Sequence, residues 1–137
     1  MVNISTELAL SISSGLHSLD GYERIAKDGE REKVIKEFYK LGGGLRMSIA
    51  KNLNILGSIQ SAYQKARDDI LRSMADRNGE VPRTKLAEFT AEERKLLDAE
   101  HNVDLCQIDE EELRLDINPI PASVLSLIHP ILNIGSC

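Results

Sequence analysis

The chain has 137 residues, of which 42% are hydrophobic, 28% charged and only 4% aromatic, and its formal net charge is −5. This length and this hydrophobic fraction fit one domain with a modest aliphatic core and exclude wholesale disorder. Scarce aromatic residues argue against base-stacking surfaces, and no apolar run approaches the ~20 residues of a membrane helix. We therefore predict one mostly α-helical domain over residues 1–137, without a membrane span.

Two further features of composition bear on location and partners. The N-terminus lacks the basic segment of a signal peptide, and the two cysteines, Cys106 and Cys137, show no paired spacing, so we expect a reduced cytoplasmic setting. Residues 22–51 hold eight Lys or Arg against five Asp or Glu, whereas residues 81–116 hold five against eleven. These segments are either solvated faces or mutually attracting surfaces. Neither is basic enough for general nucleic-acid binding.

The first predicted helix begins at Ser5 or Thr6, where apolar residues recur every three or four positions, and it ends near Gly21. Residues 22–41 are ambiguous. Asp28-Gly29 is typical of a hairpin turn, while Glu30–Tyr39 also fits a helix with interspersed charges. The turn dipeptide slightly favours a small β-hairpin or an irregular excursion.

A long helix follows, from Leu45 to about Arg77, with Asn78-Gly79 as its stop. About 32 helical residues span ~48 Å, more than a compact domain of this size needs. Helices of this length are typical of chains that pair with a partner, so we predict a homo-oligomer. Its polar positions, Asn52 and Arg67 among them, either solvate the outer face or line a ligand site between protomers.

Shorter elements pack after the long helix. Thr90–Glu93 is a capping box and predicts the start of a short helix. Residues 103–107 alternate like an extended segment, and Asp109–Glu112 is a candidate cap for another turn. Pro121 is suited to the first position of a last helix, which runs through Ile128.

The only local feature with a chemistry attached is the run of three glycines before the long helix. Gly43 and Gly44 would offer backbone N–H groups at a helix N-terminus, where the dipole favours anions. Lys40, Arg46 and Lys51 would add positive charge. We therefore predict an anion site here, although the glycines also fit a tight joint, and no Gly-Lys-Ser/Thr of a P-loop follows them.

No other pattern supports catalysis or metal binding. The three histidines lie far apart in the sequence, with none at a paired i,i+4 spacing. Nothing activates the Cys106 thiol as a nucleophile. We expect no catalytic residue, no metal and no cofactor, and therefore no enzyme.

A set of short motifs resembles a diffuse group of small, mostly uncharacterised proteins from tailed phages and prophages. The motifs are Tyr39–Gly42, Arg46–Leu53, Ala66-Arg67, Phe89…Leu97, Val103–Leu105 and Ile120…Leu127. The resemblance spans roughly residues 8–132. It implies a phage origin and action in the cytoplasm of a host bacterium, and it implies no catalytic residue.

Small phage proteins of this kind fall into two functional classes, namely counter-defence proteins and factors for virion tail assembly. Because the glycine-rich, locally basic segment offers anion donors and no nucleophile, we expect a non-catalytic counter-defence protein. It would sequester a small anionic ligand, such as a cyclic nucleotide that serves as an immune signal. The alternative is an assembly factor or inhibitor that acts through protein–protein contacts.

Overall fold

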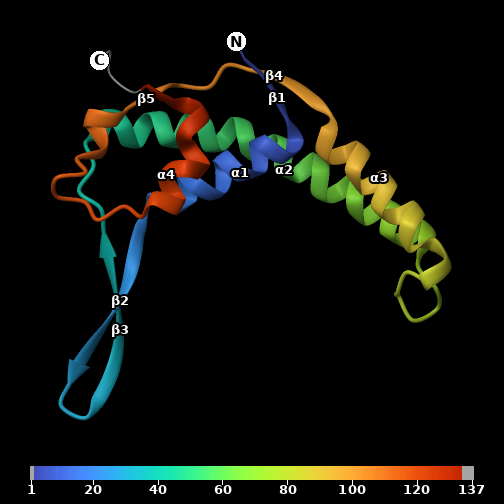
Figure 1. Cartoon of the computed structure of the whole chain (residues 1–137), viewed down its shortest axis with the longest axis horizontal. Coiled ribbons are helices and arrows are strands. Elements are labelled where there is room, and N and C mark those ends of the chain that lie inside the picture. The colour runs from blue at the N-terminus through green and yellow to red at the C-terminus, as the bar shows by residue number, and fades with distance from the viewer. Residues whose placement is uncertain (1, 134–137) are drawn as a thin grey trace. The chain divides into compact units, whose positions relative to one another are not determined.

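The computed structural model describes residues 2–133 and is mostly helical, as the sequence predicts (Figure 1). The helices of this part of the chain are α1 (Thr6–His17), α2 (Gly43–Met74), α3 (Leu86–Asp98) and α4 (Ala122–Ile128). Short 3-10 turns occur at Arg83–Lys85, Glu110–Leu113 and His129–Ile131.

The strands of the described residues form three two-stranded sheets. β1 (Val2–Ser5) pairs antiparallel with β4 (Glu100–Val103), and β2 (Gly21–Asp28) pairs antiparallel with β3 (Arg31–Phe38). β5 (Ile108–Asp109) and β6 (Leu132–Asn133) form a short parallel pair. The sequence predicts the hairpin of β2 and β3, and the extended segment that it predicts at residues 103–107 overlaps β4 only at Val103.

Internal contacts divide the described residues into two compact units. Unit 1 comprises residues 2–10 and 54–105, and unit 2 comprises residues 11–53 and 106–133. Helices α1 and α2 each contribute residues to both units. The expectation of a single domain over residues 1–137 stays a prediction, and each unit is described by itself below.

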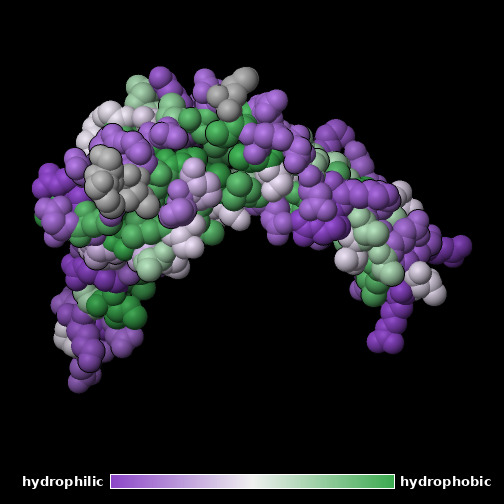
Figure 2. Space-filling model, turned by 45° about the horizontal axis from the view of Figure 1, so that its top comes forward, coloured by the Kyte–Doolittle hydropathy of each residue, from purple (hydrophilic) through white to green (hydrophobic). Residues whose placement is uncertain are grey.

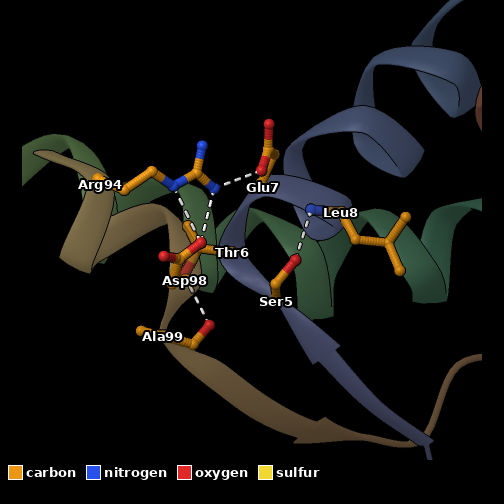
Figure 3. A network of polar contacts seen from close by, with 7 residues as sticks. All are labelled: Ser5, Thr6, Glu7, Leu8, Arg94, Asp98 and Ala99. Carbon is orange, nitrogen blue, oxygen red and sulfur yellow. Dashed lines mark hydrogen bonds and ion pairs between the residues drawn. The ribbon is translucent and has the colours of Figure 1, made fainter.

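In unit 1, polar contacts fix the start of α1, which confirms the predicted helix start. The Ser5 hydroxyl oxygen accepts the Leu8 backbone N–H at 3.1 Å, as expected of an N-cap residue (Figure 3). The Arg94 guanidinium lies between Glu7 of α1 and Asp98 of α3, with N–O distances of 2.5 and 2.7 Å. These ion pairs raise the pKa of Arg94.

The second half of unit 1 corrects one prediction. Helix α3 begins at Leu86, four residues before Thr90, so the predicted capping box is wrong. The Glu93 carboxylate accepts a hydrogen bond from Arg67 Nε of α2 at 2.8 Å. In a capping box the Glu93 side chain would bind the backbone at the helix start, but here it forms an ion pair with Arg67 of α2.

The end of α2 also lies in unit 1. The helix stops at Met74, a few residues before the predicted end. Asp76 Oδ1 accepts the backbone N–H groups of Asn78 and Glu80, and Gly79 adopts a φ of +79°. Asn78 and Gly79 therefore do not end the helix themselves. They belong to a turn that follows the helix and is held by the Asp76 carboxylate.

In unit 2, β2 and β3 form the hairpin that the Asp28-Gly29 turn favours. Asp28 pairs with Arg31, and Gly29 takes a φ of +69° in the two-residue loop between them. At the other end, a Cβ atom on Gly21 would lie 2.3 Å from the Glu37 carbonyl oxygen. Within its unit, the hairpin extends away from α1 and α4 (Figure 1).

The core of unit 2 is aliphatic, as the composition predicts. α1 and α4 are in close contact at Gly15, where an added Cβ atom would lie only 2.6 Å from Ile128 Cγ2. α4 starts at Ala122 with Pro121 as its N-cap, one position later than predicted. The following side chains of this unit are fully buried: Ile12, Leu16, Leu19, Leu45, Ile108, Leu113 and Ile128.

Candidate functional site

The glycine run lies at the start of α2 in unit 2, and the helix begins at Gly43, two residues before the predicted Leu45. Gly42, Gly43 and Gly44 are exposed, and the Gly42 carbonyl accepts the Arg46 N–H at 3.0 Å. Helix geometry leaves the first N–H groups of α2 without intrahelical acceptors. A hollow of about 260 Å³ lies beside them and is lined by Gly42, Gly44, Leu45, Glu112 and Arg114.

The three basic residues predicted for this site do not line the hollow. The Arg46 guanidinium donates to the backbone carbonyls of Leu41 and Tyr39, at 3.0 and 3.1 Å, and so braces the segment that leads into the helix. Lys51 is exposed seven residues beyond Gly44, about 10 Å further along the helix axis. Lys40 also has an exposed side chain.

Sequence reasoning missed Arg114, the cation that does line the hollow. Arg114 follows a 3-10 turn with a left-handed φ of 50°, and its guanidinium contacts Asp116 at 3.3 and 3.4 Å. This contact lowers the pKa of Asp116. Because Glu112 also lines the hollow, the charges around it nearly balance. No local pattern links Arg114 to the glycines, since only the fold brings them together.

Two buried asparagines hold the backbone of unit 2. Asn52 is 0% exposed; its Nδ2 donates to the Cys106 carbonyl at 2.9 Å, and its Oδ1 accepts the Cys106 N–H at 2.7 Å. The expectation that Asn52 solvates the outer face is therefore wrong. Its spacing of seven after Leu45 and four before Leu56 was a usable signal of a core position.

Asn118 performs the same task for the segment before α2. Its Oδ1 accepts the Lys40 N–H at 2.8 Å, and its Nδ2 donates to the carbonyls of Lys40 and Leu113, at 3.1 and 2.7 Å. The main chain of Lys40 is thus fixed while its ammonium group is free to reach solvent. Both asparagines satisfy backbone groups, which is a structural rather than a chemical role.

The hairpin of unit 2 carries the other candidate surface. Ile25, Val34 and Phe38 are 67%, 61% and 61% exposed, and Ile25 pairs directly with Val34. Alternate residues of a strand point to the same side, and the Lys36 ammonium lies 5.3 Å from the centroid of the Phe38 ring. We call this side the hairpin face; its residues are Gly21, Glu23, Ile25, Lys27, Glu32, Val34, Lys36 and Phe38.

The space-filling view places this face in context. Hydrophobic side chains appear on the hairpin, and hydrophilic ones surround its tip (Figure 2). Among the described residues, β2 and β3 pair only with each other, so the outer edge of each strand also lacks a neighbour. Ile25 and Val34 are adjacent, and the charged pair of Glu23 and Lys36 separates them from Phe38. Exposed apolar residues that gather on one face among polar ones are typical of interaction sites.

Two other cavities have less defined chemistry. One of about 510 Å³ in unit 2 is mainly apolar, with Glu110, Ser126 and His129 at its wall. One of about 220 Å³ in unit 1 lies beside Thr6, whose hydroxyl is 2.8 Å from His101 Nε2. Over residues 2–133 no group of three or more His, Cys, Asp or Glu side chains is arranged to hold a metal ion. Within the same residues, no helix has the length and apolar character of a membrane span.

No known protein family, curated protein or solved structure matches the chain.

Proposed function

We propose that the protein is a non-catalytic binding protein of phage origin that acts through protein–protein contacts of its hairpin face, as an assembly factor or an inhibitor. The observation that carries this proposal is the exposure of Ile25, Val34 and Phe38 on one face of one hairpin. This function is the alternative that the sequence offers to sequestration of a small anionic ligand. Because the predicted basic residues do not line the hollow at the glycines, the hairpin face is the better supported site.

Energetics favour a covered hairpin face. A two-stranded hairpin with no further packing is marginally stable in water. Burying a large apolar side chain yields about 1.5–3 kcal/mol, so a protein partner that covers this face would stabilise both the contact and the hairpin. A binding surface of this kind requires no nucleophile, metal or cofactor.

Site-specific photo-cross-linking in bacterial cells tests this function. A photoreactive phenylalanine analogue replaces Val34 on the hairpin face or, as the matched control, the adjacent Lys33 on the opposite face. We expect a cross-linked protein product from position 34 that is absent or much weaker from position 33. No product, or equal products from the two positions, would contradict the proposed function.

Sequestration of a small anionic ligand is the second candidate function. It is favoured by the hollow of about 260 Å³, where the exposed glycines adjoin Arg114. A nucleotide signal bound there would accept N–H groups of α2 through its phosphate. The nearly balanced charges around the hollow make this function the weaker candidate.

A thermal-shift screen against linear and cyclic nucleotides tests it. Ligand at ~100 times its dissociation constant adds ~2.7 kcal/mol to stability, which a melting curve resolves. We expect Arg114→Asn, which keeps the left-handed backbone accessible, to remove the shift, and Lys51→Ala to keep it. The absence of a shift with every nucleotide would reject sequestration and leave the hairpin function intact.

A further inference from the structure

We infer that the partner of the hairpin face is a second copy of the same face, since its charges form a self-complementary pattern around the Ile25–Val34 pair. This inference rests on the proposed function in one respect: it takes the hairpin face to be a surface that binds protein, and it names a second copy as a protein that binds there. On one side of the apolar pair, Glu23 of β2 lies opposite Lys36 of β3. On the other side the signs are exchanged, and Lys27 of β2 lies opposite Glu32 of β3.

Two copies of the hairpin face can stack on each other about a twofold axis that runs parallel to the strands. In this arrangement each charged residue of one copy faces an opposite charge of the other. β2 of one copy then lies over β3 of the other, so that Ile25 meets Val34. Glu23 meets Lys36, and Lys27 meets Glu32. Symmetry repeats each contact, and no like charges face each other at these positions. Isologous twofold contacts of this kind are the commonest interfaces of homo-oligomers.

The third apolar residue selects the relative direction of the two hairpins. In the aligned arrangement, Phe38 of one copy lies over Gly21 of the other, because these two residues are paired across the strands. Gly21 has no side chain to obstruct the ring. An antiparallel stack about Ile25 and Val34 also matches the charges, but it places Phe38 over the exposed turn. The aligned stack therefore covers all three apolar side chains.

The size of the face sets the expected affinity. Two strands of eight residues each offer less area than the ~1,200 Å² that stable complexes bury in total, so we expect a weak, concentration-dependent dimer. The ion pairs lie around the apolar pair and stay accessible to water. They contribute more to the choice of partner and register than to affinity.

The sharpest test is a double substitution that exchanges the two charges of one cross-strand pair. The variant Glu23→Lys/Lys36→Glu keeps opposite charges across the strands of each hairpin, and in the aligned stack it also keeps opposite charges between identical copies. Mixed with the wild type, it brings like charges together. We expect the variant to dimerise about as well as the wild type in sedimentation velocity, yet to exchange no subunits with it in fluorescence energy transfer.

A second exchange guards against local effects. Lys36 contacts Asp20 at 2.6 Å, and the variant above loses this exposed ion pair. Lys27→Glu/Glu32→Lys lies near the tip, away from Asp20, and we expect the same behaviour from it. Free exchange of subunits between wild type and both variants would overturn the inference, and loss of self-association in both variants would overturn the aligned stack.

The apolar centre is tested separately. Ile25→Thr/Val34→Thr keeps strand propensity but removes apolar surface, and we expect dimerisation to weaken about tenfold or more. Leu86→Thr, which alters a 46% exposed leucine of α3, is the matched control and should leave it unchanged. A wild type that stays monomeric at all concentrations overturns the inference. If position 34 then cross-links a different protein, the proposed function still stands.

Discussion

At the scale of single residues, the buried asparagines show how this chain uses polar groups in an aliphatic core. Asn52 presents both a donor and an acceptor to the backbone of Cys106, as a neighbouring strand would. Its amide therefore satisfies two main-chain groups that would otherwise be desolvated without partners.

We expect Asn52→Ala to lower the free energy of unfolding by about 2–4 kcal/mol, because it leaves the Cys106 N–H and C=O without these partners. Chemical denaturation measures this change. Asn54→Ala, two residues along the same helix at an exposed position, is the control and should cost less than about 0.5 kcal/mol. Equal effects of the two substitutions would show that the Asn52 hydrogen bonds do not stabilise the fold.

Tyr39 provides a test by pH. Burial raises the pKa of its phenol above 10.0, with a smaller contribution from Tyr22, whose ring centroid lies 5.3 Å away. The folded state therefore retains this proton more tightly than the unfolded state, and the associated stability is present below pH ~10 and lost as the pH rises further. We expect an absorbance titration of the folded protein to show a late phenolate that Tyr39→Phe removes. A titration unchanged by Tyr39→Phe would contradict this.

At the scale of elements, two helical glycines have opposite environments. In α2, a Cβ on Gly57 would meet no atom within 4 Å, so the glycine only adds backbone freedom to the unfolded chain. In α1, a Cβ on Gly15 would meet Ile128 Cγ2 at 2.6 Å and Leu127 Cβ at 2.8 Å. The first glycine is replaceable, while the second sets the distance between α1 and α4.

The same substitution should therefore act in opposite directions at these two positions. We expect Gly57→Ala to raise the free energy of unfolding by about 0.5–1 kcal/mol. We expect Gly15→Ala to lower it by about 1–3 kcal/mol, because the added methyl group overpacks the contact with α4. Denaturant titrations of the two variants measure both, and a shared sign would contradict the packing described for one of the helices.

Local signals in the sequence predict part of these elements. The apolar spacing of α2 and the Asp28-Gly29 turn identify the long helix and the hairpin, because both depend on neighbouring residues. The start of α3 does not follow from the predicted capping box: Thr90 lies inside the helix, and the Glu93 carboxylate binds Arg67 of α2 instead. The hollow at the glycines could not be predicted, since Arg114 reaches it only through the fold.

At the scale of the whole molecule, the two compact units carry different kinds of surface. In unit 1 an exposed ion pair joins Arg94 of α3 to Glu7 of α1, whereas unit 2 exposes Ile25, Val34 and Phe38 on its hairpin. Exposed apolar side chains on one face are typical of interaction surfaces, and they are the basis of the contact that we propose for the hairpin. The residues of this face alternate along each strand in the sequence. Which residues of β2 and β3 lie opposite each other follows only from the register of the hairpin.

The most direct test of the hairpin face is hydrogen exchange of the wild-type protein at increasing protein concentration. A second copy on the hairpin face would slow exchange of the β2 and β3 amides, because the bound hairpin opens less often than a free one. We predict that protection of residues 21–38 rises with concentration, while that of α3 stays constant. Exchange of the hairpin that is fast and independent of concentration would contradict the paired face.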